Sequence, residues 1–180
     1  MTMTQKEITY DEAYAFIYIT AVHEAGHAVM NFLWRSTVDS ITIIPDEDRG
    51  RGGCCRLKKT KKLERVCKAL FYGEKPTLRD MEYYFQSSMA GEIAEHLVFG
   101  KDPTAVLNGK YVSSDTDKAF EAVRALDLPD EWAYSLYVDA LFKLEPHVTA
   151  IKKIADELMV LEKMSGALAR KIFVKERSGG

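Results

Sequence analysis

The amino-acid sequence predicts a single, mainly α-helical domain with a small β-ribbon or sheet after its first long helix. Its 180 residues are enough to bury a hydrophobic core without disulfide support, and they contain no internal repeat. Apolar residues recur at helical spacing through most of the chain, whereas a short stretch at residues 40–45 is rich in β-branched residues. We therefore expect one domain over residues 1–180, with flexible tails at residues 1–8 and 175–180.

Composition and charge argue against several classes of protein. The 25 basic and 27 acidic residues nearly cancel, so we expect no nucleic-acid partner. The basic run at residues 58–68 is interpreted as a solvated loop. Cys54, Cys55 and Cys67 lack the spacing of a disulfide framework or zinc site, which favours a reducing, cytoplasmic setting. Residues 1–11 lack the basic and apolar regions of a signal peptide.

The first helix is expected over residues 10–34, because Thr9 and Glu12 form a capping-box pattern. The segment is long enough to span a bilayer, and past its first turn it carries one formal charge, Glu24. Two histidines accompany that charge, and no second apolar segment would shield these groups from lipid. We therefore expect a buried central helix and no membrane span. Gly26 costs about 1 kcal/mol relative to alanine inside a helix, which indicates a close neighbour.

A small sheet is expected next. Residues 40–45 combine β-branched residues with a terminal proline, which predicts a strand. After a glycine-rich loop, residues 53–57 could return as a second strand. The free edge of such a pair could accept an extended peptide as an added strand. An ordinary two-stranded ribbon is the alternative.

Helices are expected in the remainder of the chain. Thr77 is the capping residue of a helix that reaches Gly100, and its apolar residues recur at helical spacing. Proline or serine–glycine breaks separate the later helices. These helices are expected to begin near residues 113, 128, 145 and 165.

The strongest chemical signal is the pattern His-Glu-x-x-His at residues 23–27. On a helix His23 and His27 share a face, because four residues is just over one turn, and the two imidazoles can hold one tetrahedral ion. Glu24 lies beside them, where its carboxylate can act on a water molecule without replacing a ligand. Two histidines that happen to lie four residues apart in a core or on a surface are the alternative.

Helical spacing distinguishes two nearby aspartates. Asp115 shares a face with Ala119, Ala122 and Leu126 and is expected to point inward, whereas Asp117 is expected to face solvent. Acidic residues are also common in the first turn of a helix, where they complement its dipole. Spacing alone therefore leaves open whether Asp115 is a metal ligand.

Taken in order, these segments resemble the peptidase domain of the FtsH family of membrane-bound, ATP-dependent zinc proteases, over roughly residues 9–174. The sequence HEAGHA at residues 23–28 is similar to the family's metal-binding helix. The sequence AGEIAEHLVFG at residues 90–100 is similar to the helix GGRxAEE that ends in FG, with His96 in place of the second glutamate. The sequence SDTDKA at residues 114–119 is similar to the segment NDxxxA.

The resemblance implies a zincin-like helical metallopeptidase domain in which His23, His27 and Asp115 hold Zn²⁺. The 180 residues contain no phosphate-binding loop of the type GxxxxGK[ST], so we expect a stand-alone peptidase domain without its own ATPase. Such a domain would cut flexible or unfolded polypeptides, or depend on a separate ATPase or adaptor partner to deliver them. A monomer or small oligomer is expected.

The principal hypothesis is therefore a zinc-dependent metalloendopeptidase with Glu24 as its catalytic base. Glu95 is a candidate for orienting a histidine, with a structural ion pair as the alternative. Tyr111 and His96 are candidates for stabilising an oxyanion; a packed or exposed His96 is the alternative. The main rival is a non-catalytic protein-binding or regulatory module that retains the metal-bound fold, although such a module would not need Glu24. A zinc hydrolase acting on another class of substrate also stays open.

Overall fold

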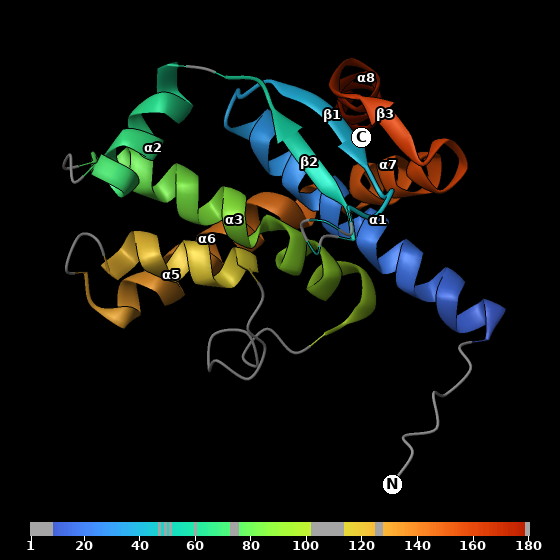
Figure 1. Cartoon of the computed structure of the whole chain (residues 1–180), viewed down its shortest axis with the longest axis horizontal. Coiled ribbons are helices and arrows are strands. Elements are labelled where there is room, and N and C mark those ends of the chain that lie inside the picture. The colour runs from blue at the N-terminus through green and yellow to red at the C-terminus, as the bar shows by residue number, and fades with distance from the viewer. Residues whose placement is uncertain are drawn as a thin grey trace, which may run out of the picture.

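The chain is mainly helical, with a small three-stranded antiparallel sheet (Figure 1). The computed structural model describes residues 9–46, 48, 50, 52–59, 61–72, 76–101, 114–124 and 128–178. The predicted tail at residues 1–8 lies outside this part of the chain. In order, the elements are α1 (Tyr10–Leu33), β1 (Val38–Thr42), β2 (Cys54–Leu57), α2 (Lys61–Tyr72), α3 (Leu78–Phe99), α5 (Ser114–Arg124), α6 (Asp130–Leu144), the 3-10 turn η2 (Glu145–His147), α7 (Val148–Leu161), β3 (Lys163–Ser165) and α8 (Gly166–Ser178).

Helix α1 is the central element of the fold. Its start is fixed by the predicted capping box, in which the Thr9 hydroxyl accepts from the Glu12 backbone N–H and the Glu12 carboxylate accepts from the Thr9 N–H. From Ala21 onward the helix is largely buried against α3, α6, α7, α8 and the sheet. Its first turns extend past the other elements in Figure 1, and there Tyr14 and Phe16 are exposed. The expected burial of the whole helix is therefore wrong for this end.

The closest approach in the core is between α1 and α3, at Gly26. A Cβ atom on Gly26 would lie 2.5 Å from the Ala90 carbonyl oxygen and 2.5 Å from the Ala94 Cβ. No side chain fits in that space, so the glycine predicted to have a close neighbour does have one. Helix α3 itself begins at the Thr77 cap and ends at Gly100, which has a left-handed φ of 69°.

The sheet has the order β2-β1-β3. Both predicted strands are present, and they pair antiparallel with Ile41 opposite Cys55. The first begins and ends earlier than predicted, at Val38–Thr42 instead of residues 40–45. Strand β3 was not predicted, because three residues carry no recognisable alternation and the strand depends on pairing with β1, for example Ile41 with Met164. Strand β2 lies at one edge of the sheet.

Two local predictions were wrong. Part of the basic run at residues 58–68 belongs to helix α2 rather than to a solvated loop, because Val66 is buried while the charged Lys61, Arg65 and Lys68 face solvent. Residues 175–178 continue helix α8 instead of forming a tail. An ion pair of 2.7 Å between Glu176 Oε1 and Lys153 Nζ connects that last turn to α7.

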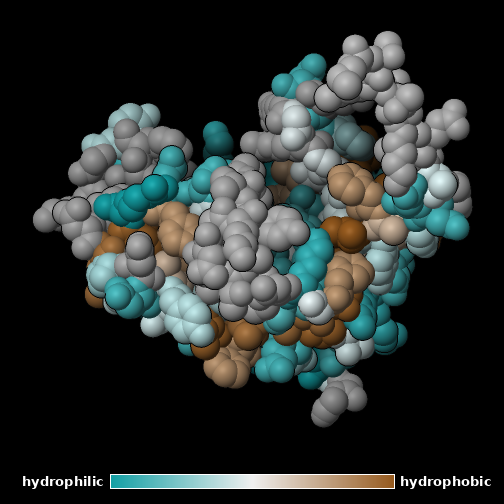
Figure 2. All heavy atoms as spheres, turned by 90° about the horizontal axis from the view of Figure 1, so that it is seen from below, coloured by the Kyte–Doolittle hydropathy of each residue, from teal (hydrophilic) through white to brown (hydrophobic). Residues whose placement is uncertain are grey.

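Within the described ranges, no helix has both the length and the apolar character needed to cross a bilayer. Hydrophobic side chains nevertheless reach the surface. On the face shown in Figure 2 they form several clusters among hydrophilic residues, a distribution that is ordinary for a folded domain.

Gly26→Ala is expected to lower the free energy of unfolding by about 1–3 kcal/mol, because the added Cβ would overpack the contact between α1 and α3. Helix propensity alone predicts the opposite sign, a gain of about 1 kcal/mol. Urea denaturation followed by circular dichroism measures the difference. Gly52→Ala is the control, since a Cβ at Gly52 would meet no atom closer than 3.7 Å. Unchanged or raised stability of Gly26→Ala would contradict the close packing.

Candidate metal centre

Three side chains from two helices converge on one point. His23 and His27 come from α1, and Asp115 comes from the first turn of α5. The two Nε2 atoms are 3.1 Å apart, and Asp115 Oδ2 lies 3.3 Å from Nε2 of His23 and 3.4 Å from Nε2 of His27. The structure thus brings together residues that are 92 positions apart in the sequence.

This triangle has the dimensions of one face of a metal-coordination tetrahedron. Ligand atoms bound about 2.0–2.1 Å from a tetrahedral ion lie about 3.3–3.4 Å from one another. The three observed separations, 3.1, 3.3 and 3.4 Å, match this spacing. Two imidazole nitrogens and one carboxylate oxygen could therefore hold a divalent metal ion and leave a fourth position open.

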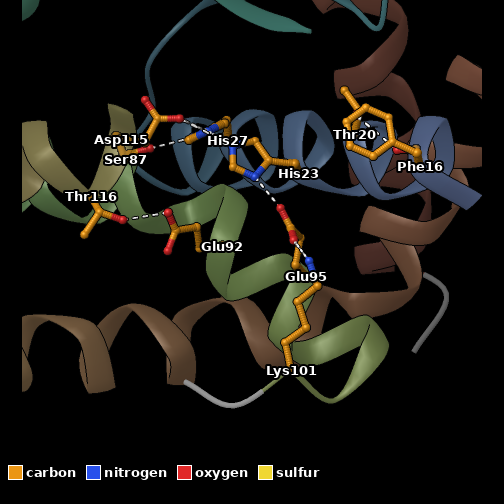
Figure 3. Close-up of polar contacts among 10 residues, drawn as sticks. All are labelled: Phe16, Thr20, His23, His27, Ser87, Glu92, Glu95, Lys101, Asp115 and Thr116. Carbon is orange, nitrogen blue, oxygen red and sulfur yellow. Dashed lines mark hydrogen bonds and ion pairs between the residues drawn. The ribbon is translucent and has the colours of Figure 1, made fainter. Parts of the chain in front are cut away.

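The outer nitrogens of both imidazoles are held by helix α3 (Figure 3). His27 Nδ1–H donates to the Ser87 carbonyl oxygen at 2.7 Å, and His23 Nδ1–H donates to Glu95 Oε1 at 2.7 Å. With the proton on Nδ1, the Nε2 lone pair of a neutral imidazole points to the shared site. Glu95, predicted as a group that orients a histidine, has the contact that this role requires.

Gly91 makes room for one of these imidazoles. A Cβ atom at Gly91 would overlap the His23 ring, so a side chain there would displace the ligand. Sequence inspection missed Gly91, as well as the Ser87 carbonyl, which contacts a ligand through its backbone. The glycine in the middle of a predicted apolar helix was a usable signal for close packing.

Asp115 uses its two oxygens differently. Oδ2 faces the histidines, whereas Oδ1 accepts a hydrogen bond of 2.6 Å from Lys118 Nζ. The lysine side chain therefore favours a single inward-facing carboxylate oxygen. Asp117 is exposed on the opposite side of the same helix turn, which confirms the distinction made from helical spacing.

The electrostatic field of the site favours positive charge. Burial lowers the pKa of His23, but hydrogen bonds to Asp115 and Glu95 outweigh it and raise that pKa to about 10. Burial raises the pKa of Asp115, yet His23, His27 and Lys118 hold it far below its usual range. The pKa of Glu95 is likewise lowered, because His23 and Lys101 outweigh burial. A cation bound at this site would take the place of the proton on the His23 imidazole.

Glu24 is the acidic side chain next to the ligand triangle. It is 7% exposed. Burial raises the pKa of its carboxyl group, and the two histidines and the Cys55 backbone N–H partly offset that rise. Because Cys55 lies on β2, this hydrogen bond indicates that the strand runs alongside the carboxylate.

A cavity of about 590 Å³ contains these groups. Its walls come from one face of α1, from positions 50, 52–55 and 57, from α3 and from α5. At one end lie Phe16 and Ile19; at the other lie Asn31, Tyr83 and Tyr84. The candidate metal ligands lie between the two ends.

Neither a comparison with protein-family models nor one with curated proteins finds a match for this chain. Function is therefore inferred from the donor atoms and their surroundings.

Tyr111 and His96 were the two candidates for stabilising an oxyanion. Tyr111 lies outside the described residues. His96 is absent from the lining of the cavity, and its Nδ1–H donates to the Lys101 carbonyl oxygen. The interpretation of His96 as a packed or exposed side chain is the one that agrees with this position.

Asp115→Asn is expected to weaken Zn²⁺ binding by more than about 100-fold, because losing a ligand exceeds the usual 10–100-fold cost of losing a group that orients one. Competition with a chromogenic chelator measures the affinity. Asp117→Asn, two residues away and exposed, is the control and should bind Zn²⁺ as the wild type does. Equal affinity for both variants would exclude Asp115 as a ligand.

Glu95→Gln is expected to weaken Zn²⁺ binding by about 10–100-fold without abolishing it, because the amide orients His23 less firmly than the carboxylate does. The same competition assay applies. Glu121→Gln, an exposed substitution on α5, is the control for loss of one negative charge. If both variants lose affinity equally, the effect of Glu95 is one of net charge and not of orientation.

Proposed function

We propose that this chain is a zinc-dependent endopeptidase that hydrolyses peptide bonds in flexible or unfolded polypeptides. The observation that carries the proposal is the ligand triangle of His23, His27 and Asp115 with the buried Glu24 beside it. A purely structural metal site would have no use for a fourth, unbound carboxylate at that position.

The donor set supports zinc as the metal. Imidazole nitrogen and carboxylate oxygen at tetrahedral spacing are ligands that Zn²⁺ accepts in catalytic sites, where three protein groups leave one position for water or substrate. When bound, Zn²⁺ supplies Lewis-acid polarisation of a carbonyl group and lowers the pKa of a water ligand towards about 7.

Glu24 would perform the proton transfers. Its carboxylate would take a proton from the attacking water and return it to the nitrogen of the departing amine. Burial raises the pKa of Glu24, which brings the carboxylate closer to the range in which a general base works efficiently near neutral pH. The two histidines and the Cys55 backbone N–H lower the pKa of this carboxyl group, which favours its ionised form.

The shape of the cavity supports a polypeptide substrate. It follows α1 from Phe16 to Asn31, which is about 22 Å at 1.5 Å per residue. An extended chain of about six or seven residues has that length. Strand β2 lines the cavity and, among the described residues, is an edge strand of the sheet. An extended substrate could bind beside such an edge as an added strand.

The arrangement of the segments also supports a zincin-like peptidase related to the FtsH family. The three sequences that resemble this family lie on α1, α3 and α5, and each contributes a polar group to the same site. We propose a cytoplasmic location, with which the free thiols of Cys54 and Cys55 agree. We also propose a monomer or small oligomer. A separate ATPase or adaptor would serve to deliver folded substrates.

Glu24→Gln is expected to bind Zn²⁺ like the wild type and to lose at least about 100-fold in kcat/KM, because proton transfer contributes about 10²–10⁴-fold. Cleavage of a disordered, fluorescently labelled protein measures activity, and metal analysis of the same samples measures zinc. Wild-type activity should disappear with a chelator and return with added Zn²⁺.

Asp117→Asn is the control for expression and handling, and it should remain active. Chelator-insensitive cleavage by the wild type, or full activity of Glu24→Gln, would contradict the proposed peptidase. Zinc binding without any cleavage would instead favour a non-catalytic module.

A further inference from the structure

One end of the cavity carries an aromatic side chain for which the ligand triangle has no use. Phe16 is 67% exposed although it lines the cavity, and Ile19 lines the same end. Figure 3 shows Phe16 on α1 beyond Thr20, on the side of His23 away from His27. Positions 16, 20, 23 and 27 follow one face of a helix, so the ring and the candidate ligands share a stripe.

The groups around Phe16 offer few polar contacts. The Thr20 hydroxyl donates to the Phe16 carbonyl oxygen at 3.2 Å and is thus engaged within α1. Across the cavity, Gly50 and Gly52 present no side chain. A Cβ at Gly50 would meet no atom within 4 Å, whereas one at Gly52 would be in ordinary van der Waals contact with Thr20 at 3.7 Å. This end can therefore receive a bulky side chain.

Lys101 and Lys118 line the cavity, and each is paired with a carboxylate. The Lys101 ammonium bonds to the Glu95 carboxylate, and Lys118 bonds to Asp115. The end of the cavity opposite Phe16 is lined by Asn31, Tyr83, Tyr84, Ser87 and Ser88. The cavity is thus apolar at one end and polar at the other.

We infer that Phe16 and Ile19 form a subsite for a large apolar side chain of the substrate, about three residues from the scissile bond. The inference rests on the proposed peptidase function and deepens it. From Phe16 to His23 the helix rises about 10 Å, and an extended chain advances about 3.3 Å per residue, which sets the distance of three residues. An exposed phenylalanine can bury a large apolar area against a bound side chain, which favours binding.

The test maps cleavage sites in a mixture of disordered peptides. Wild type should favour Phe, Leu or Met over Ser or Asp at a fixed position about three residues from the cut, by about 10-fold or more in kcat/KM. Phe16→Ala should lose most of this preference while keeping its zinc content. Tyr14→Ala is the matched control, because Tyr14 is an exposed aromatic on the same helix that does not line the cavity.

A binding assay tests the subsite independently of catalysis. A labelled peptide with one Phe and its Phe→Ser partner are titrated against zinc-loaded Glu24→Gln, with and without Phe16→Ala. A preference for the Phe peptide that Phe16→Ala removes supports the subsite, even if no variant cleaves and the peptidase proposal fails. A preference that survives Phe16→Ala, no preference at all, or a preference for acidic peptides overturns it.

Discussion

The contact between α1 and α3 controls the orientation of both imidazoles. At Gly26 the two helices are too close for any side chain, and this approach brings the Ser87 carbonyl and the Glu95 carboxylate to the Nδ1 atoms of His27 and His23. Since each ring is held at its outer nitrogen, the inner Nε2 atoms are directed to one point. Preorganisation of this kind reduces the entropy lost on binding.

The two carboxylates around the histidines, those of Glu95 and Asp115, are arranged in the same way. Glu95 presents one oxygen to His23 and the other to Lys101, and Asp115 presents one oxygen to the histidines and the other to Lys118. Each lysine lies on the outer side of its carboxylate, which keeps one oxygen directed inward. Buried carboxylates are costly without such partners, so the lysines stabilise an arrangement in which negative potential is concentrated at the ligand triangle.

The cavity relates this centre to a substrate. Its length along α1 suits several residues of an extended chain, and the edge strand β2 runs beside the buried Glu24. The two ends of the cavity differ in polarity. Phe16 lies at one end, whereas tyrosine, serine and asparagine side chains line the other. In the proposed peptidase, a substrate would be selected at a distance from the bond that is cut, while the reacting groups would contact mainly its backbone.

What the sequence determined is local. The pair His23 and His27 on one helical face, the adjacent Glu24, the caps of α1 and α3 and the inward direction of Asp115 all follow from spacing within a few residues. The resemblance to the FtsH family implied Asp115 as a third ligand, and the tertiary structure then brought its carboxylate to the histidines. Only the tertiary structure showed that Ser87 and Gly91 adjoin them and that β3 completes the sheet. These contacts join residues far apart in the chain or involve backbone atoms. Local periodicity of side chains predicts neither kind of contact.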